Sequence, residues 1–121
     1  MEKTIEDKLK LLDIENAMYV FFIASSLICI NANEEVRKKY LNNEKIDKNI
    51  QSEYLLGAYF ALIVFIVFME RNYDNLNYIN KNTREYDLGE MRLFGSTLIV
   101  LGQLIVIYYL YNSDTFNGGS I

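Results

Sequence analysis

Six charged residues that flank long apolar runs could bind an ion or a phosphate. They are four carboxylates and two arginines: Asp13, Glu15, Glu70, Arg71, Glu90 and Arg92. Carboxylates gathered at a membrane surface can bind a divalent cation or, through the metal, a lipid phosphate. The alternative interpretation is a solvated rim of ion pairs, in which Glu70 and Arg92 pair across a helical hairpin.

A second group of polar residues lies inside the apolar runs. Ser25 and Ser26 stand near the middle of the first run, and Gln103 stands near the middle of the last. A side-chain amide in hydrocarbon costs free energy unless it is hydrogen-bonded. Gln103 is therefore predicted to face the other helices and to bond a serine hydroxyl or its own copy in a second protomer. Such a midplane layer either holds helices together or lines a path for a small polar substrate or ion.

The composition supplies little else for chemistry. The chain has no histidine and one cysteine, Cys29, so it lacks the usual ligands of zinc and iron sites and cannot form an intrachain disulfide. Its 12 basic and 16 acidic residues give a net charge of −4, whereas a nucleic-acid-binding protein needs a basic face. We predict no catalytic residue, no cofactor, no metal site and no nucleic-acid partner.

Three apolar runs must position these polar groups, and we predict that each is a membrane-spanning helix. The spans are expected at about 17–33, 54–69 and 91–111. The stretch 93–111 has 19 residues without charge or proline, and its helix would rise about 28 Å, close to the ~30 Å hydrocarbon core of a bilayer. The run 54–69 is the shortest, at 16 residues or about 24 Å of helix.

The predicted fold is all-α: a polytopic membrane protein whose three transmembrane helices form an up-down-up bundle over 17–111. An amphipathic segment at 1–16 precedes it, with Thr4 as a helix cap, and this segment either lies in the membrane interface or forms the first turns of the next helix. Asp87 is the predicted cap of the third helix. The tail at 112–121 is expected to be flexible.

Small residues within the spans are the predicted sites of close helix packing, because they allow two backbones to approach. These candidates are Gly57, Ala61, Gly95 and Gly102.

The distribution of basic residues suggests an orientation. Seven Lys or Arg stand on the side of the N-terminus and second loop, and five stand on the side of the first loop and tail. The positive-inside rule then predicts a multi-pass protein of the cell membrane with a cytoplasmic N-terminus and an external C-terminus.

In size and number of spans the chain resembles the bacterial diacylglycerol kinases, integral-membrane enzymes with three spans and an interfacial N-terminal helix. Glu70 and Asn72, at the end of the second span, suggest the comparison. The pattern then departs, because Arg71, Tyr73 and Asp74 stand where that family has small and apolar residues before a second glutamate. No Lys–Asp pair precedes the third span, so the likeness is one of topology and the chain is assigned to no family.

Three functions remain as hypotheses. The first is a non-enzymatic membrane protein that acts by helix contact as an accessory, regulatory or protective (immunity-like) factor. The second is a self-assembling pore, holin-like or transporter-like, built around the midplane layer; the absence of charged residues within the apolar runs disfavours ion coupling. The third is a small membrane enzyme. The expected partners are membrane lipid and either another membrane protein or further copies of the chain.

Overall fold

The computed structural model describes residues 3–119, which form three long α-helices and one short 3₁₀ helix, without a β-strand. The helices are α1 (Ile5–Leu41), α2 (Lys48–Asn75) and α3 (Arg84–Asn112), and η1 (Leu76–Tyr78) follows α2. All three long helices are long and apolar enough to cross a membrane. The prediction of an all-α chain with three candidate membrane-spanning helices is confirmed.

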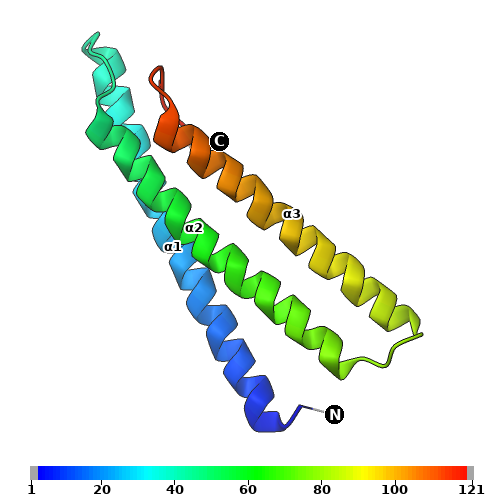
Figure 1. Cartoon of the computed structure of the whole chain (residues 1–121). Helices are drawn as coiled ribbons and strands as arrows, with labels where there is room; N and C mark the ends of the chain where they lie inside the picture. Colours follow the sequence, from blue (N-terminus) through cyan, green and yellow to red (C-terminus); the bar gives the residue numbers. More distant parts are fainter. Residues whose placement is uncertain (1–2, 120–121) are drawn as a thin grey trace.

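The central helix is α2, which packs against both α1 and α3 (Figure 1). Each helix runs in the opposite direction to the one before it, and the α2–α3 connection lies at the same end as the start of α1 (Figure 1). Among the described residues, no Cα atom of α1 comes within 8 Å of one in α3. The three helices therefore do not close into a compact bundle, and α1 and α3 remain separated across α2.

The N-terminal segment belongs to α1. This helix has 37 residues, about 56 Å at its rise per residue, because no glycine or proline interrupts it. Thr4 caps it, with its side-chain oxygen accepting a hydrogen bond from the Asp7 N–H at 3.1 Å. Residues 5–16 are thus the first turns of the first long helix, and the separate interfacial helix is not formed; Met1 and Glu2 lie outside the described residues.

The third helix begins earlier than the sequence suggested. Its N-cap is Thr83, whose side-chain oxygen accepts from the Tyr86 N–H at 3.2 Å, so the prediction of Asp87 as the cap is wrong. Asp87 lies instead in the first turn with Glu85, where a carboxylate is favoured by the positive end of the helix dipole. Thr83 takes the cap because its hydroxyl satisfies an amide that would otherwise have no partner within the helix.

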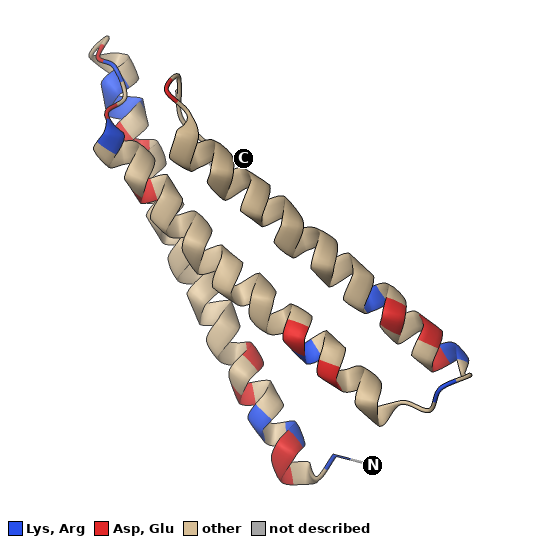
Figure 2. Ribbon diagram, in the orientation of Figure 1, with Lys and Arg blue, Asp and Glu red and all other residues tan. Residues whose placement is uncertain are grey.

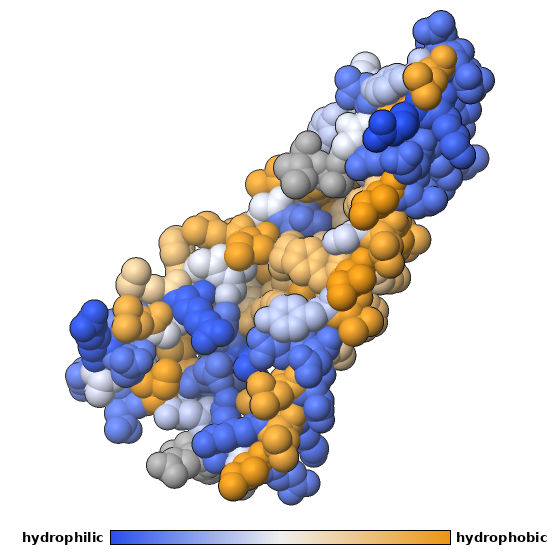
Figure 3. Space-filling view, turned by 180° about the vertical axis from the view of Figure 1, so that it is seen from behind, coloured by the Kyte–Doolittle hydropathy of each residue, from blue (hydrophilic) through white to orange (hydrophobic). Residues whose placement is uncertain are grey.

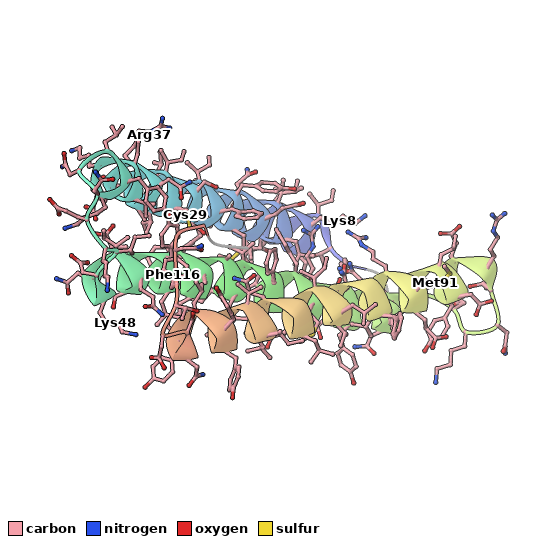
Figure 4. All side chains as sticks on the ribbon, turned by 90° about the horizontal axis from the view of Figure 1, so that it is seen from above. Lys8, Cys29, Arg37, Lys48, Met91 and Phe116 are labelled. Atoms are coloured by element: carbon pink, nitrogen blue, oxygen red, sulfur yellow. The ribbon has the colours of Figure 1, made fainter. Side chains whose placement is uncertain are left out.

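The segment after α3 is packed against the other helices, in contrast to the expected flexible tail. Phe116 is buried, and its ring lies 5.2 Å from that of Tyr54. The segment crosses α2 toward α1 (Figure 4), where the Tyr40 hydroxyl donates to the Asn117 carbonyl. Gln51 donates from its amide to the Leu110 and Ser113 carbonyls, at 2.6 and 2.9 Å. The described part of the tail, up to residue 119, therefore closes this end of the molecule.

Charge is confined to the ends of the helices and to the segments outside them. Charged residues lie at both ends of α1 and α2 and in the first turns of α3, and the length between them is uncharged (Figure 2). In the space-filling view, hydrophobic residues gather along the middle of the molecule between more hydrophilic ends (Figure 3). This segregation is what a helix needs in order to cross hydrocarbon with its ends in water.

Candidate functional site

The midplane polar residues from α1 and α3 both bond to the backbone of α2. The buried Ser25 hydroxyl donates to the Gly57 carbonyl oxygen at 2.7 Å. The Gln103 amide donates to the carbonyl oxygen of the next residue, Ala58, at 2.9 Å. Gln103 therefore faces the other helices as predicted, but its partner is a carbonyl and neither a serine nor a second copy.

Ser26 does not join this layer. Its hydroxyl donates to the Phe22 carbonyl one turn back in the same helix, at 3.0 Å, as serine commonly does within a helix. The three predicted residues thus divide into two interhelical bonds and one local bond. They do not surround a common space, because the helices that carry Ser25 and Gln103 lie on separate sides of α2.

Of the four predicted packing residues, two are packed within the chain and two are open. A Cβ atom on Gly57 would stand 2.8 Å from the Cys29 Sγ and 3.3 Å from the Ser25 carbonyl oxygen. Figure 4 shows Cys29 at the boundary of α1 and α2. Ala61, one turn after Gly57, is also buried. A Cβ atom on Gly95 or on Gly102 would meet nothing within 4 Å among the described atoms, so these two do not serve packing between the helices of one chain.

Three of the six predicted charged residues meet at one end of the molecule. The Arg71 guanidinium of α2 bonds the Glu15 carboxylate of α1 at 2.8 Å, and the two side chains are 20% and 26% exposed. Glu15 also accepts from the Tyr19 hydroxyl at 3.0 Å. The Arg71 guanidinium, then the Tyr19 hydroxyl, lower the pKa of Glu15, and Arg92 of α3 is near enough to lower it further. Glu15 precedes the uncharged run 17–33, so these bonds form at the edge of the apolar region.

The other three charged residues lie apart from this group. Asp13 and Glu90 are exposed, and Glu70 lines a different hollow with Tyr73 and Asp74. The expected Glu70–Arg92 ion pair is not among the ion pairs of residues 3–119, because Arg92 lies toward Glu15 on a different side of α2. The two neighbours Glu70 and Arg71 necessarily point about 100° apart on a helix, and Arg71 is the one that turns toward α1.

Glu15, Arg71 and Arg92 stand at the mouth of a groove between α1 and α3 whose floor is α2. This cavity has a volume of about 440 Å³. Seven further residues complete its lining: Tyr19, Phe65, Phe68, Asn72, Gly95, Ser96 and Ile99. Seen from behind, the molecule forks toward this end (Figure 3).

The lining of the groove changes from polar to apolar along its length. On the floor, Asn72 lies near the helix end, and Phe68 and Phe65 follow at successive turns toward the middle of α2. The Asn72 amide donates to the Ser96 hydroxyl of α3, which ties the two helices at the polar end. On the α1 side, the Tyr19 ring packs 6.0 Å from that of Phe68. The groove therefore has a charged mouth and an aromatic interior.

A second hollow of about 440 Å³ continues the groove beyond its mouth and shares Asn72 and Arg92 with it. Lys3 and Lys8, near the start of α1, also line this hollow. Lys3 donates to the Asn75 side-chain oxygen and lies 4.8 Å from the centre of the Tyr78 ring. Basic side chains therefore predominate where the two hollows meet.

The sequence did not reveal the roles of several of these residues. Asn72 was noted only in the comparison with the diacylglycerol kinases and Ser96 was not noted, although the two side chains bond each other across α2 and α3. Gln51 was also missed; it stands three residues before Tyr54 and seven before Ala58, and this helical spacing places it on the buried stripe of α2.

The opposite end of α1 and α2 holds a second carboxylate contact that the sequence did not reveal. Glu53, which precedes the run 54–69, lies against Glu35 of α1, and one Glu53 oxygen is buried without a hydrogen-bond partner. Burial first, and then the charge of Glu35, raise the pKa of Glu53. Among residues 3–119, no group of three or more His, Cys, Asp or Glu side chains is placed to hold a metal ion.

Comparison of the chain with protein-family models, with curated proteins and with solved structures gave no match.

Proposed function

We propose that this chain is a multi-pass membrane protein without catalytic activity, which acts by helix contact on another membrane protein as an accessory, regulatory or protective subunit. The observation that carries the proposal is the outward surface of α1 and α3. Only 11% of the most apolar 18-residue window of each is buried within the chain. Soluble monomers rarely expose apolar patches above a few hundred Å², so this surface fits lipid and the helices of a partner.

The charge distribution supports a cell-membrane orientation with the N-terminus in the cytoplasm. The start of α1 and the α2–α3 connection lie at one end (Figure 2), and that end carries seven Lys or Arg against five at the other. The positive-inside rule places the more basic end in the cytoplasm. A reporter fused after Ile121 that is active only in the cytoplasm would contradict this orientation.

The residues that suggested a pore or transporter make other contacts. Ser25 and Gln103 donate their hydrogen bonds to α2, and Ser26 donates to its own helix. Each of these side chains therefore donates a hydrogen bond to backbone of its own chain, whereas a water-filled path needs polar groups turned toward a shared space. The contact-acting function requires no such path.

Photo-crosslinking in native membranes tests the proposal. A photoreactive residue replaces Ile105 of α3, which is 69% exposed, and in a second variant replaces Val20 of α1, which is 65% exposed. One dominant foreign membrane protein captured from either position, and competed away by the unmodified chain, is the expected result. Capture of further copies of this chain alone would overturn the proposal in favour of a self-assembled pore, and capture of lipid alone would overturn it as well.

A further inference from the structure

We propose that the groove between α1 and α3 is a binding site for one anionic phospholipid, with the phosphate at Arg92 and Arg71 and an acyl chain along the aromatic floor of α2. The inference relies on the membrane placement proposed above. It does not depend on a partner protein, so its failure and the failure of the contact function are separable.

The charge at the mouth of the groove fits a phosphate. Arg71 is already paired with Glu15, but its buried Nε atom has no hydrogen-bond partner among the described residues. Arg92 forms none of the ion pairs of residues 3–119 and lines both hollows. Together with Arg71 and Arg92, the two hollows are lined by Lys3 and Lys8 against a single carboxylate, that of Glu15, and arginine donors match phosphate oxygens in geometry.

The direction of the groove fits an amphiphile. Its charged mouth lies where the charged segments of the helices end, and its aromatic interior lies along the uncharged length (Figure 2). A phospholipid in the same leaflet has its phosphate at the membrane surface and its acyl chains deeper in the hydrocarbon, so its polar and apolar parts would lie at the same depths as those of the groove. Basic pockets between transmembrane helices on the cytoplasmic side are known to hold anionic headgroups, and the basic end is the cytoplasmic end of the proposed orientation.

The lining of the groove fits a lipid chain. Its interior is formed by the aromatic side chains of Tyr19, Phe65 and Phe68, which offer apolar surface to an acyl chain. A single acyl chain is thinner than a helix and has no backbone polar groups to satisfy.

The test measures lipid binding by the full chain purified in detergent, with native mass spectrometry as the readout. Phosphatidylglycerol is compared with phosphatidylcholine of the same acyl chains and with inorganic phosphate. We expect phosphatidylglycerol to bind at least tenfold more tightly than phosphatidylcholine, and we expect millimolar inorganic phosphate not to displace it.

Two pairs of variants locate the site. Arg92→Gln should weaken phosphatidylglycerol binding about fivefold, as expected for one basic residue at a membrane surface, whereas Arg84→Gln, an exposed position on the same helix outside the groove, should leave it within about twofold. Gly95→Leu should fill the interior and abolish acyl-chain binding. Gly102→Leu adds the same side chain where a Cβ is equally unobstructed, and should bind like the parent chain.

Circular dichroism of each variant checks that it folds. If Gly95→Leu does not fold, the comparison of Arg92→Gln with Arg84→Gln still tests the proposal. Equal binding of the two lipids, or displacement by inorganic phosphate alone, would overturn the proposal. So would Arg92→Gln and Gly95→Leu behaving like their controls, or a dimer of this chain that phosphatidylglycerol does not dissociate.

Discussion

Ser25 of α1 and Gln103 of α3 donate hydrogen bonds to consecutive carbonyl groups of α2, those of Gly57 and Ala58. Both bonds lie in the uncharged length of the helices, where a polar side chain without a partner costs free energy. Because the two acceptors are neighbours, α1 and α3 are fixed to α2 at nearly the same depth. These bonds position α2 as the central helix and leave α1 and α3 apart.

Ser25→Ala should loosen the contact between α1 and α2. Loss of the interhelical bond is expected to lower the free energy of unfolding by about 0.6 kcal/mol, and at most ~1.7 kcal/mol. Ser26→Ala is the matched control, because its hydroxyl bonds only within α1, and it should have no measurable effect. Unfolding by sodium dodecyl sulfate, followed by circular dichroism, measures both; equal effects of the two variants would contradict the assignment.

Gly57→Ala should be more damaging than any other glycine-to-alanine change in the three helices. The new methyl group would stand 2.8 Å from the Cys29 Sγ and 3.3 Å from a backbone oxygen, so α1 must move away. Overpacking of this kind costs about 1–3 kcal/mol. Gly102→Ala meets nothing within 4 Å, and alanine favours a helix over glycine, so this control should be neutral or slightly stabilising in the same unfolding assay.

The sequence predicted the features of the fold that depend on composition over long stretches. Uncharged runs of 16 or more residues, without proline, can hardly be anything but helices in a chain of this length, so the three helices and their approximate spans were predictable. Helix ends were less so, because Thr83 and Asp87 are both good caps and only the conformation of the preceding loop decides between them.

The partners of the polar residues were not predictable from the sequence. Gln103 was expected to bond a side chain, because a sequence identifies side-chain donors and acceptors by residue type. Its acceptor is instead a backbone carbonyl, which any residue at position 58 would supply. The ion pair between Glu15 and Arg71 depends on how α2 is rotated about its own axis. This rotation is set by the packing of α2 against both α1 and α3. The packed tail depends on one aromatic side chain, Phe116, and on bonds from Tyr40 and Gln51 to backbone carbonyls of the tail, and the residue types of the tail are otherwise typical of loose segments.

Glu15→Gln should reduce stability at neutral pH and weaken its dependence on acid. The pKa of Glu15 is lowered in the folded chain, first by Arg71, so the folded state binds this proton less tightly than the unfolded state. The stabilisation is therefore complete above the ordinary pKa of 4.5 and is lost as the pH falls through the lower, folded value.

Unfolding measured at about pH 7 and about pH 3, on either side of the ordinary carboxyl range, tests this expectation. The original chain should lose more stability between the two than Glu15→Gln loses. Asp13→Asn is the control, an exposed carboxylate on the same helix that forms no ion pair with another described residue. A Glu15→Gln chain as stable as the parent at neutral pH would show that the contact with Arg71 contributes nothing.

Glu53→Gln should act in the opposite direction and stabilise the protein at neutral pH. Burial and the nearby Glu35 raise the pKa of Glu53 in the folded chain, so the folded state holds this proton more tightly. The original chain should gain stability as the pH falls through the raised value toward 4.5, because protonation relieves the buried charge. The amide variant should lack this gain.

The same unfolding assay, run between about pH 8 and about pH 4, distinguishes the two chains. Glu34→Gln, at an exposed neighbour of Glu35, serves as the control and should keep the gain. Lower stability of Glu53→Gln than of the parent at pH 8 would contradict the placement of Glu53 against a second carboxylate.

The central claim is that the apolar lengths of all three helices lie in lipid, and fractionation of cells expressing the untagged chain tests it most directly. Helices whose most apolar windows are 11%, 28% and 11% buried within the chain should remain in the membrane pellet after alkaline carbonate washing and leave it only in detergent. A chain that stays in the high-speed supernatant without detergent, as a monodisperse helical particle, would contradict the account.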